Sequence, residues 1–198
     1  TYNDETLRNT GIRSPLDRAI LARALRQLDK MGAKAVGIDV MIDQPRPEDA
    51  ELIAALKQMR IPTYLAFATN ETAPRVIQLW QEDFVRNFKA QIDNPNVRFA
   101  HIVLDPDPED GVMRSWPRAY PGLPPSFAYA LAGGVHPEMK NYSGSIAYRL
   151  PADPSVPVFS NLPIDRAAYL AHVASYAPSP PGLDCVQGGG CAMAPVPR

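Results

Sequence analysis

Three short, nearly continuous apolar runs constrain the fold of this chain more than any other feature. They cover residues 35–42, 63–68 and 97–104, and the segments between them are long enough to form helices. Apolar runs without polar alternation are typical of strands buried on both faces, as in parallel sheets. A strand–helix–strand–helix–strand order predicts an α/β fold with a parallel core sheet, right-handed connections and flanking helices.

The segment before the first run, residues 14–31, has the signals of an amphipathic helix. Ser14 is a natural N-cap, Pro15 fits the first helical position, and Asp17 can act as the capping-box acid. Gly32 follows the helix, where a left-handed exit residue is expected. This helix should cover one face of the sheet.

Two further helices are expected between the runs, at residues 47–61 and 73–92. Pro47, Glu48 and Asp49 favour the start of the first, and Pro62 ends it. The second is amphipathic, because apolar residues recur at helical spacing. We expect one side of this helix to carry Val76, Ile77, Trp80, Phe84, Val85 and Phe88.

The pattern loosens after the third run. Additional antiparallel strands are expected at 112–119, 145–150 and 156–160, with short helices at 124–134 and from Pro163 onward. The sequence holds 22 prolines, and residues 178–198 are rich in proline and glycine. We therefore interpret residues 1–177 as a single domain and residues 178–198 as a tail or loop.

The only two cysteines, Cys185 and Cys191, lie in this tail and are separated by VQGGG. The spacing is not that of a zinc or thioredoxin motif. A disulfide formed in an oxidising compartment is favoured slightly over two free thiols.

Charge and motifs exclude several classes of function. The net charge of −1 gives no electrostatic reason to expect nucleic acid as a partner, and no run is long enough to span a bilayer. The sequence contains no GxxxxGK[ST], GxGxxG, GxSxG or HExxH motif, and His101, His136 and His172 are widely separated. We therefore expect neither a catalytic residue nor a cofactor.

The acidic segment DPDPEDG, residues 105–111, alternates carboxylates as a calcium loop does. Its glycine, Gly111, falls at position 7 instead of 6, and Trp116 occupies the position of the bidentate glutamate. An ordinary acidic turn is therefore favoured over a metal site.

Polar residues follow the ends of the three expected strands. In an open parallel sheet, ligands bind outside the carboxyl ends of the strands, so Asp43, Asn70 and Asp105 should line one rim. Arg114 is expected to help bind the ligand there. Asp39 lies inside the first run, where a buried structural acid paired with Arg114 or backbone donors is expected.

Several of these segments together resemble the second type of CHASE domain, a bacterial family of cyclase/histidine-kinase-associated sensory extracellular domains. The resemblance covers about residues 3–162. It consists of a Pro-x-x-Arg helix start, a G-A-K-A-V-G-x-D strand, a D-P-E-D-G-x-x-R loop and a Pro-Ser-aliphatic helix. The matching positions are Pro15, Arg18, Gly32, Ala33, Asp39, Asp110, Gly111, Arg114, Pro125 and Ser126.

The resemblance implies a non-catalytic sensory ectodomain on the periplasmic or extracellular side of a bacterial inner-membrane protein. Its output module would be an adenylate or diguanylate cyclase, or a histidine or Ser/Thr kinase. The expected partners are a small-molecule or protein signal and a second copy of the chain, with contact through helix 14–31 or 73–92. Two alternatives stay open: a divalent-metal hydrolase or transferase using Asp39, Asp43 and Asp105, and a structural module that binds only a protein.

Overall fold

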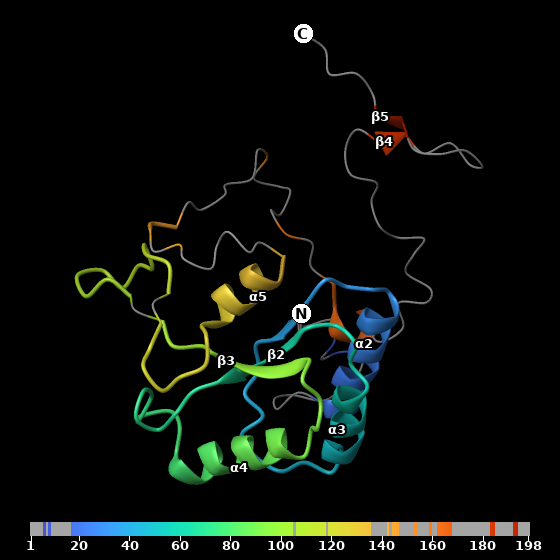
Figure 1. Ribbon diagram of the computed structural model, residues 1–198, viewed down its shortest axis with the longest axis horizontal. Helices are drawn as coiled ribbons and strands as arrows, with labels where there is room; N and C mark the ends of the chain where they lie inside the picture. The colour runs from blue at the N-terminus through green and yellow to red at the C-terminus, as the bar shows by residue number, and fades with distance from the viewer. Residues whose placement is uncertain are drawn as a thin grey trace.

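A three-stranded parallel sheet is the centre of the fold (Figure 1). Its strands β1 (Val36–Ile38), β2 (Thr63–Phe67) and β3 (Val97–His101) lie in that order. The computed structural model describes residues 17–104, 106–117 and 119–135, with shorter pieces at 6, 8, 142, 144–146, 153, 159, 162–167, 183–184 and 192–193. The predicted parallel strand–helix–strand–helix–strand core is therefore confirmed.

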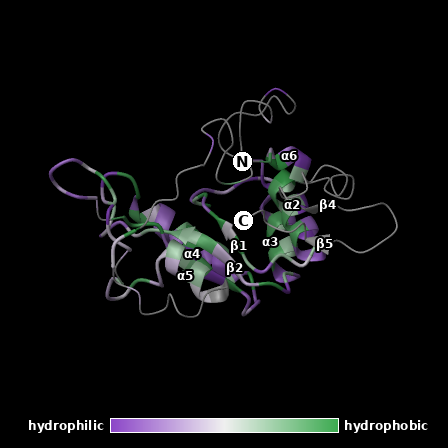
Figure 2. Cartoon of the chain, turned by 90° about the horizontal axis from the view of Figure 1, so that it is seen from above, coloured by the Kyte–Doolittle hydropathy of each residue, from purple (hydrophilic) through white to green (hydrophobic). Residues whose placement is uncertain are grey.

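Three helices pack on one face of the sheet: α2 (Arg18–Lys30), α3 (Asp49–Lys57) and α4 (Leu79–Ala90). The strand order follows the chain order, so right-handed connections place α3 and α4 on the same face. Figure 2 shows α2 and α3 side by side, each with hydrophobic and hydrophilic stretches. The shared core contains Leu21, Leu25, Ile38, Leu52, Leu56, Leu65, Phe88, Ile92 and Val97, all buried.

Helix α5 (Phe127–Val135) packs on the opposite face, above the sheet in Figure 1. A Cβ atom at Gly37, in the middle of β1, would lie 2.7 Å from Cζ of Phe127 and 2.9 Å from Cδ1 of Leu131. Only glycine therefore allows this approach of helix to strand. Ser126 caps the start of the helix, because its hydroxyl accepts a hydrogen bond from the Tyr129 amide at 3.2 Å. The predicted short helix is confirmed.

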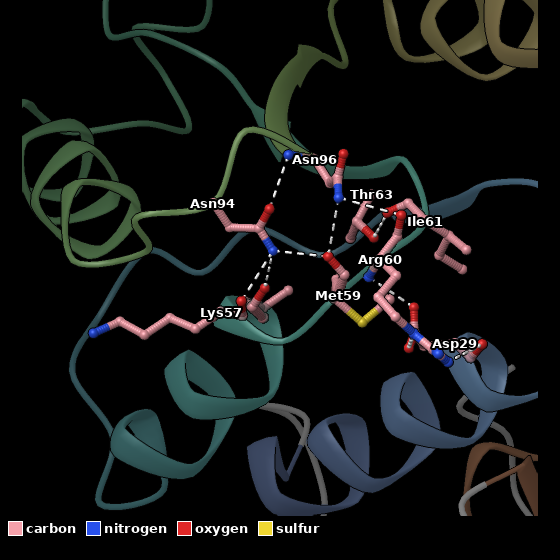
Figure 3. A network of polar contacts seen from close by, with 9 residues as sticks. Asp29, Lys57, Met59, Arg60, Ile61, Thr63, Asn94 and Asn96 are labelled. Atoms are coloured by element: carbon pink, nitrogen blue, oxygen red, sulfur yellow. Dashed lines mark hydrogen bonds and ion pairs between the residues drawn. The ribbon is translucent and has the colours of Figure 1, made fainter.

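Two asparagines hold the amino edge of the sheet, the end at which its parallel strands begin (Figure 3). The opposite end, where the strands finish, is the carboxyl edge. The side-chain amide of Asn94 donates to the carbonyls of Leu56 at 2.9 Å and Met59 at 2.9 Å, where α3 ends. Asn96 donates to the Met59 carbonyl as well, at 3.2 Å. These bonds satisfy carbonyl groups that a helix end leaves without partners. They tie the end of α3 to the start of β3.

The same edge is joined to α2 by Asp29. Its carboxylate accepts from the Arg60 amide at 2.8 Å and from Arg60 Nε at 2.8 Å (Figure 3). Burial raises the pKa of Asp29, but the hydrogen bonds and charge of Arg60 outweigh it, so the pKa lies below its ordinary value.

Several predicted boundaries were wrong. Helix α2 begins at Arg18 and is capped by Asp17, whose Oδ1 accepts from the amides of Ala19 and Ile20 at 2.7 and 3.1 Å. Asp17 is thus the N-cap itself and not the capping-box acid, while Ser14 and Pro15 lie outside the described residues.

Two other elements are shorter than predicted. Strand β1 ends at Ile38, so Asp39 lies after the strand, and its side chain is exposed instead of buried. Helix α4 begins at Leu79 and not at Ala73, because residues 73–76 form turns.

The later part of the chain differs most from the prediction. At 112–119 the described residues show only an isolated antiparallel bridge, between Ser115 and Ser145, and no strand. Most of the other two predicted strands lies outside the described residues. A short helix α6 (Ile164–Ala167) begins where expected, and β4 (Leu183–Asp184) pairs antiparallel with β5 (Ala192–Met193). Among the described residues, no helix combines the length and hydropathy needed to cross a bilayer.

Candidate functional site

A cavity of about 800 Å³ opens beyond the carboxyl end of β2. Three segments line it: residues 69–72, the face of α4 that carries Leu79, Glu82 and Arg86, and the loop 120–123. Its volume falls in the range of roughly 300–1,000 Å³ that small-molecule sites occupy. Its place matches the rule that ligands bind at the carboxyl ends of parallel strands.

The loop that leaves β2 is shaped by two threonines. The hydroxyls of Thr69 and Thr72 lie 3.0 Å apart, and the Thr69 amide donates to Thr72 Oγ1 at 3.2 Å. Such hydroxyl-to-backbone bonds stabilise tight turns. Because Thr69 is buried and Thr72 is half-buried, this turn fixes the floor of the cavity beside Asn70.

Asn70 is held by α4. Its amide donates to Glu82 Oε2 at 2.9 Å, and its side chain donates to the Ile77 carbonyl at 2.6 Å. Glu82 in turn accepts from Arg86 Nη2 at 2.7 Å. The predicted site residue Asn70 therefore lines the cavity, connected to a carboxylate and a guanidinium.

The guanidinium of Arg86 lies 4.8 Å from the centre of the Phe67 ring, and Phe67 stacks on Phe99 with centroids 4.5 Å apart. A cation over an aromatic face is stabilised by the ring quadrupole. Burial raises the pKa of Glu82, but hydrogen bonds from Arg86 and from the Asn70 amide outweigh this, so the pKa lies below its ordinary value. Glu82 is therefore ionised at neutral pH.

The third wall is the turn at residues 120–123. Gly122 has φ of +77°, a conformation that residues with a side chain rarely adopt, and the Leu123 amide donates to the Tyr120 carbonyl at 3.2 Å. The edge of Tyr120 meets the ring of the buried His101, with centroids 5.3 Å apart. This contact joins the wall to the end of β3.

The predicted rim residues do not form one cluster. Asp43 accepts from Gln81 Nε2 at 2.6 Å, which ties the loop after β1 to the first turn of α4. Asp39 lines a separate cavity of about 200 Å³ together with His101 and Ser126. Asp105 lies outside the described residues.

Arg114 belongs to its own loop. Its Nη1 donates to Asp107 at 3.0 Å and to Asp110 at 2.8 Å, and Gly111 turns the chain with φ of +73°. The hydrogen bond from Arg114 lowers the pKa of Asp110, and the same bond raises the pKa of Arg114. Arg114 lines a third cavity, of about 180 Å³. Arg114, one of the partners expected for a buried Asp39, thus binds the acidic loop instead.

Two carboxylates of the acidic loop, Asp107 and Asp110, are therefore bound by Arg114. Among the residues that the structure describes, no group of three or more His, Cys, Asp or Glu side chains is arranged to hold a metal ion.

Arg18, a motif position, lies buried at the carboxyl edge beside β1. It pairs with Asp49 at the start of α3 and donates to the Gln44 carbonyl at 2.6 Å. Its guanidinium is 5.8 Å from the centre of the Phe88 ring. Burial lowers the pKa of Arg18, and the neighbouring Arg46 adds to this. Arg18 thus fastens the loop after β1 to two helices.

Sequence reasoning missed Glu82, Arg86 and Tyr120. The spacing of Glu82 and Arg86, four residues apart on a helix that follows a strand end, was a readable signal of an ion pair near the rim. Tyr120 had no comparable signal, because its position depends on the path of the chain after β3.

A three-stranded parallel sheet with helices on both faces and a polar cavity at its carboxyl end defines an α/β domain. The CHASE2 domain family model matches residues 1–181 of the 198. The chain therefore belongs to the CHASE2 family, whose members are extracellular, non-catalytic sensory domains of signalling proteins in membranes. A search of curated proteins and a search of solved structures each found no match.

Proposed function

We propose that this domain senses a small polar molecule that binds in the cavity lined by residues 69–72, α4 and residues 120–123. The observation that carries the proposal is the place and size of this cavity, about 800 Å³ at the carboxyl end of β2. The cavity is lined by carboxylates, a guanidinium, hydroxyls and Tyr120. These groups offer both hydrogen-bond donors and acceptors and both signs of charge, which suits a ligand with several polar groups.

The signal would leave the cavity through α4. Glu82 and Arg86 line the cavity from this helix, and Asp43 is bonded to Gln81 in its first turn. A ligand that competes for Glu82 or Arg86 would weaken the link to Asn70 and favour a second position of the helix. Binding shifts such an equilibrium only through its different affinity for the two states.

The output module would lie on the cytoplasmic side of a bacterial inner membrane, as an adenylate or diguanylate cyclase or a histidine or Ser/Thr kinase. Family membership supports an extracytoplasmic location for the sensor itself.

A disulfide between the two cysteines would agree with this location, because disulfides form in oxidising compartments. Cys185 follows β4 directly and Cys191 precedes β5 directly, and these two strands are antiparallel partners. Both cysteines lie outside the described residues. We propose a disulfide between them, which thiol titration before and after reduction would test.

The test of the sensing function is thermal unfolding of the purified chain against a panel of small metabolites. A ligand at 100 times its dissociation constant adds about 2.7 kcal/mol to the stability of the folded state. We expect at least one polar metabolite to raise the melting temperature of the wild type. The variant Leu123→Trp should abolish this rise, because the larger side chain fills the cavity wall.

Arg114→Ala is the matched control, because Arg114 is exposed and lies in the separate acidic loop. It should keep the ligand-induced shift. A shift that Arg114→Ala removes and Leu123→Trp preserves would place the site elsewhere and contradict the proposal.

A further inference from the structure

The start of α4 presents an apolar surface that the rest of the described chain does not cover. We define the α4 surface as Val76, Leu79 and Trp80 together with the flanking Arg75 and Asp83. The apolar side chains are 72%, 68% and 56% exposed, and Leu79 and Trp80 both belong to the first turn of α4. The prediction that Val76 and Trp80 share one side with the buried Val85 and Phe88 was therefore wrong.

Helix geometry explains why. The buried stripe of α4 contains Val85 and Phe88 and continues to Ile92, which lies just past the end of the helix. At 100° per residue, Trp80 lies roughly 110° from the centre of this stripe, and Leu79 lies farther still. A large aromatic side chain left on the outside is costly in water and is enriched at the centres of protein interfaces.

The charges beside the apolar residues point to the occupant. Arg75 precedes the patch and Asp83 follows it, and both are exposed. Neither takes part in an ion pair among the described residues. A partner of uniform charge would be attracted by one side and repelled by the other. A second copy related by a twofold axis would place Arg75 against the partner's Asp83, and the reverse, around a shared apolar centre.

We propose that the α4 surface is the contact between two copies of this domain. Three apolar side chains supply the centre of such a contact but not the roughly 800 Å² per partner of a standard interface, so the polar neighbours on α4 form its rim. Leu79 lines both the cavity and the α4 surface. A ligand in the cavity would therefore contact Leu79, which also takes part in the dimer contact. Through this side chain, ligand binding is coupled to dimer formation.

The test is sedimentation equilibrium of the full chain without any ligand. The wild type forms a dimer, and Arg75→Glu and Asp83→Arg each weaken it about tenfold or more, because each change sets like charges against each other twice. The double variant Arg75→Glu/Asp83→Arg restores association to within about threefold of the wild type. This rescue distinguishes a twofold contact from a general effect of charge.

Two further variants complete the design. Trp80→Lys dissociates the dimer, and Met31→Lys, at an exposed apolar residue at the end of α2, leaves it unchanged. A wild type that stays monomeric up to about 0.5 mM, a dimer insensitive to the single exchanges, or a double variant without rescue overturns the proposal. The inference does not rest on the proposed ligand: association is measured without one, and the metabolite panel on Trp80→Lys tests the cavity by itself.

Discussion

The two edges of the parallel sheet are built on opposite principles. At the amino edge, Asn94 and Asn96 donate to the carbonyls at the end of α3, and Asp29 receives two hydrogen bonds from Arg60. At the carboxyl edge, the polar groups of Asn70, Glu82 and Arg86 surround a cavity of about 800 Å³. Polar groups at the first edge only join elements of the fold, whereas those at the second are bonded to each other and also line a cavity. The contrast separates residues that join the fold from residues that we propose bind the ligand.

The largest effect on stability is expected at the carboxyl edge, where the part beside β1 is held by Arg18 and serves the fold. Arg18→Ala should lower the free energy of unfolding by about 3 kcal/mol, because it leaves the partly buried Asp49 without its charged partner. Urea unfolding measures the loss. The matched control is Arg26→Ala on the same helix: the side chains of Arg26 and its partner Glu51 are 38% and 41% exposed, so the change should be below about 1 kcal/mol. Equal losses in the two variants would mean that Arg18 does not fasten the β1 side of this edge.

A smaller loss is expected at the amino edge. Asn94→Ala should lower the free energy of unfolding by about 2 kcal/mol, since it removes the buried side-chain amide that donates to the carbonyls of Leu56, Lys57 and Met59 at the end of α3. Asn87→Ala, on the exposed face of α4, should change it by less than about 0.5 kcal/mol. Ligand-induced shifts should be the same in Asn94→Ala as in the wild type. If Asn94→Ala unfolds like the wild type but loses the ligand-induced shift, the sensing site lies at the amino edge, which contradicts the proposal.

Each edge also carries a carboxylate whose pKa is lowered, Asp29 and Glu82. A folded-state pKa below the unfolded one stabilises the fold at pH values above the unfolded pKa, and this contribution is lost as the pH falls through the folded pKa. Asp29→Asn and Glu82→Gln should therefore each flatten the decline of stability below about pH 5, by about 1 kcal/mol, because their arginine partners are exposed. Urea midpoints measured between pH 2 and 7 give the slopes.

The two variants should differ in one respect. Glu82→Gln also alters ligand binding, because Glu82 lines the cavity, whereas Asp29→Asn leaves binding unchanged. Two identical binding profiles would remove the distinction between the edges.

The smallest expected effect on stability lies in the cavity itself. Glu71 is exposed and lines the cavity, so Glu71→Gln should change the free energy of unfolding by less than about 0.5 kcal/mol. Its affinity for the bound metabolite should change if the ligand carries charge. A loss above about 1 kcal/mol would show that this side chain serves the fold after all.

The sequence was sufficient to predict the sheet and its helices, because apolar runs and helical periodicity report burial directly. It placed Asn70 at the correct edge for the same reason, since strand ends follow from strand positions. It placed Trp80 on the same side of its helix as Phe88, because a stripe of apolar residues does not say which of its members lie outside the buried face.

The sequence could not show that Arg114 binds Asp107 and Asp110 instead of Asp39. That choice depends on the path of a loop, and a local turn brings charges four residues apart together more readily than a distant strand end does. Tyr120 was beyond reach for a related reason, because its contact with His101 depends on how the chain returns to the sheet.

Hydrogen exchange of the full chain, with and without the metabolite that raises the melting temperature most, tests the central claim most directly. The account predicts added protection in residues 69–72, in the first turns of α4 and in residues 120–123, with no change at residues 94–96 and 57–60. Protection confined to the amino edge or to the acidic loop around Arg114 would contradict the assignment of the cavity as the sensing site.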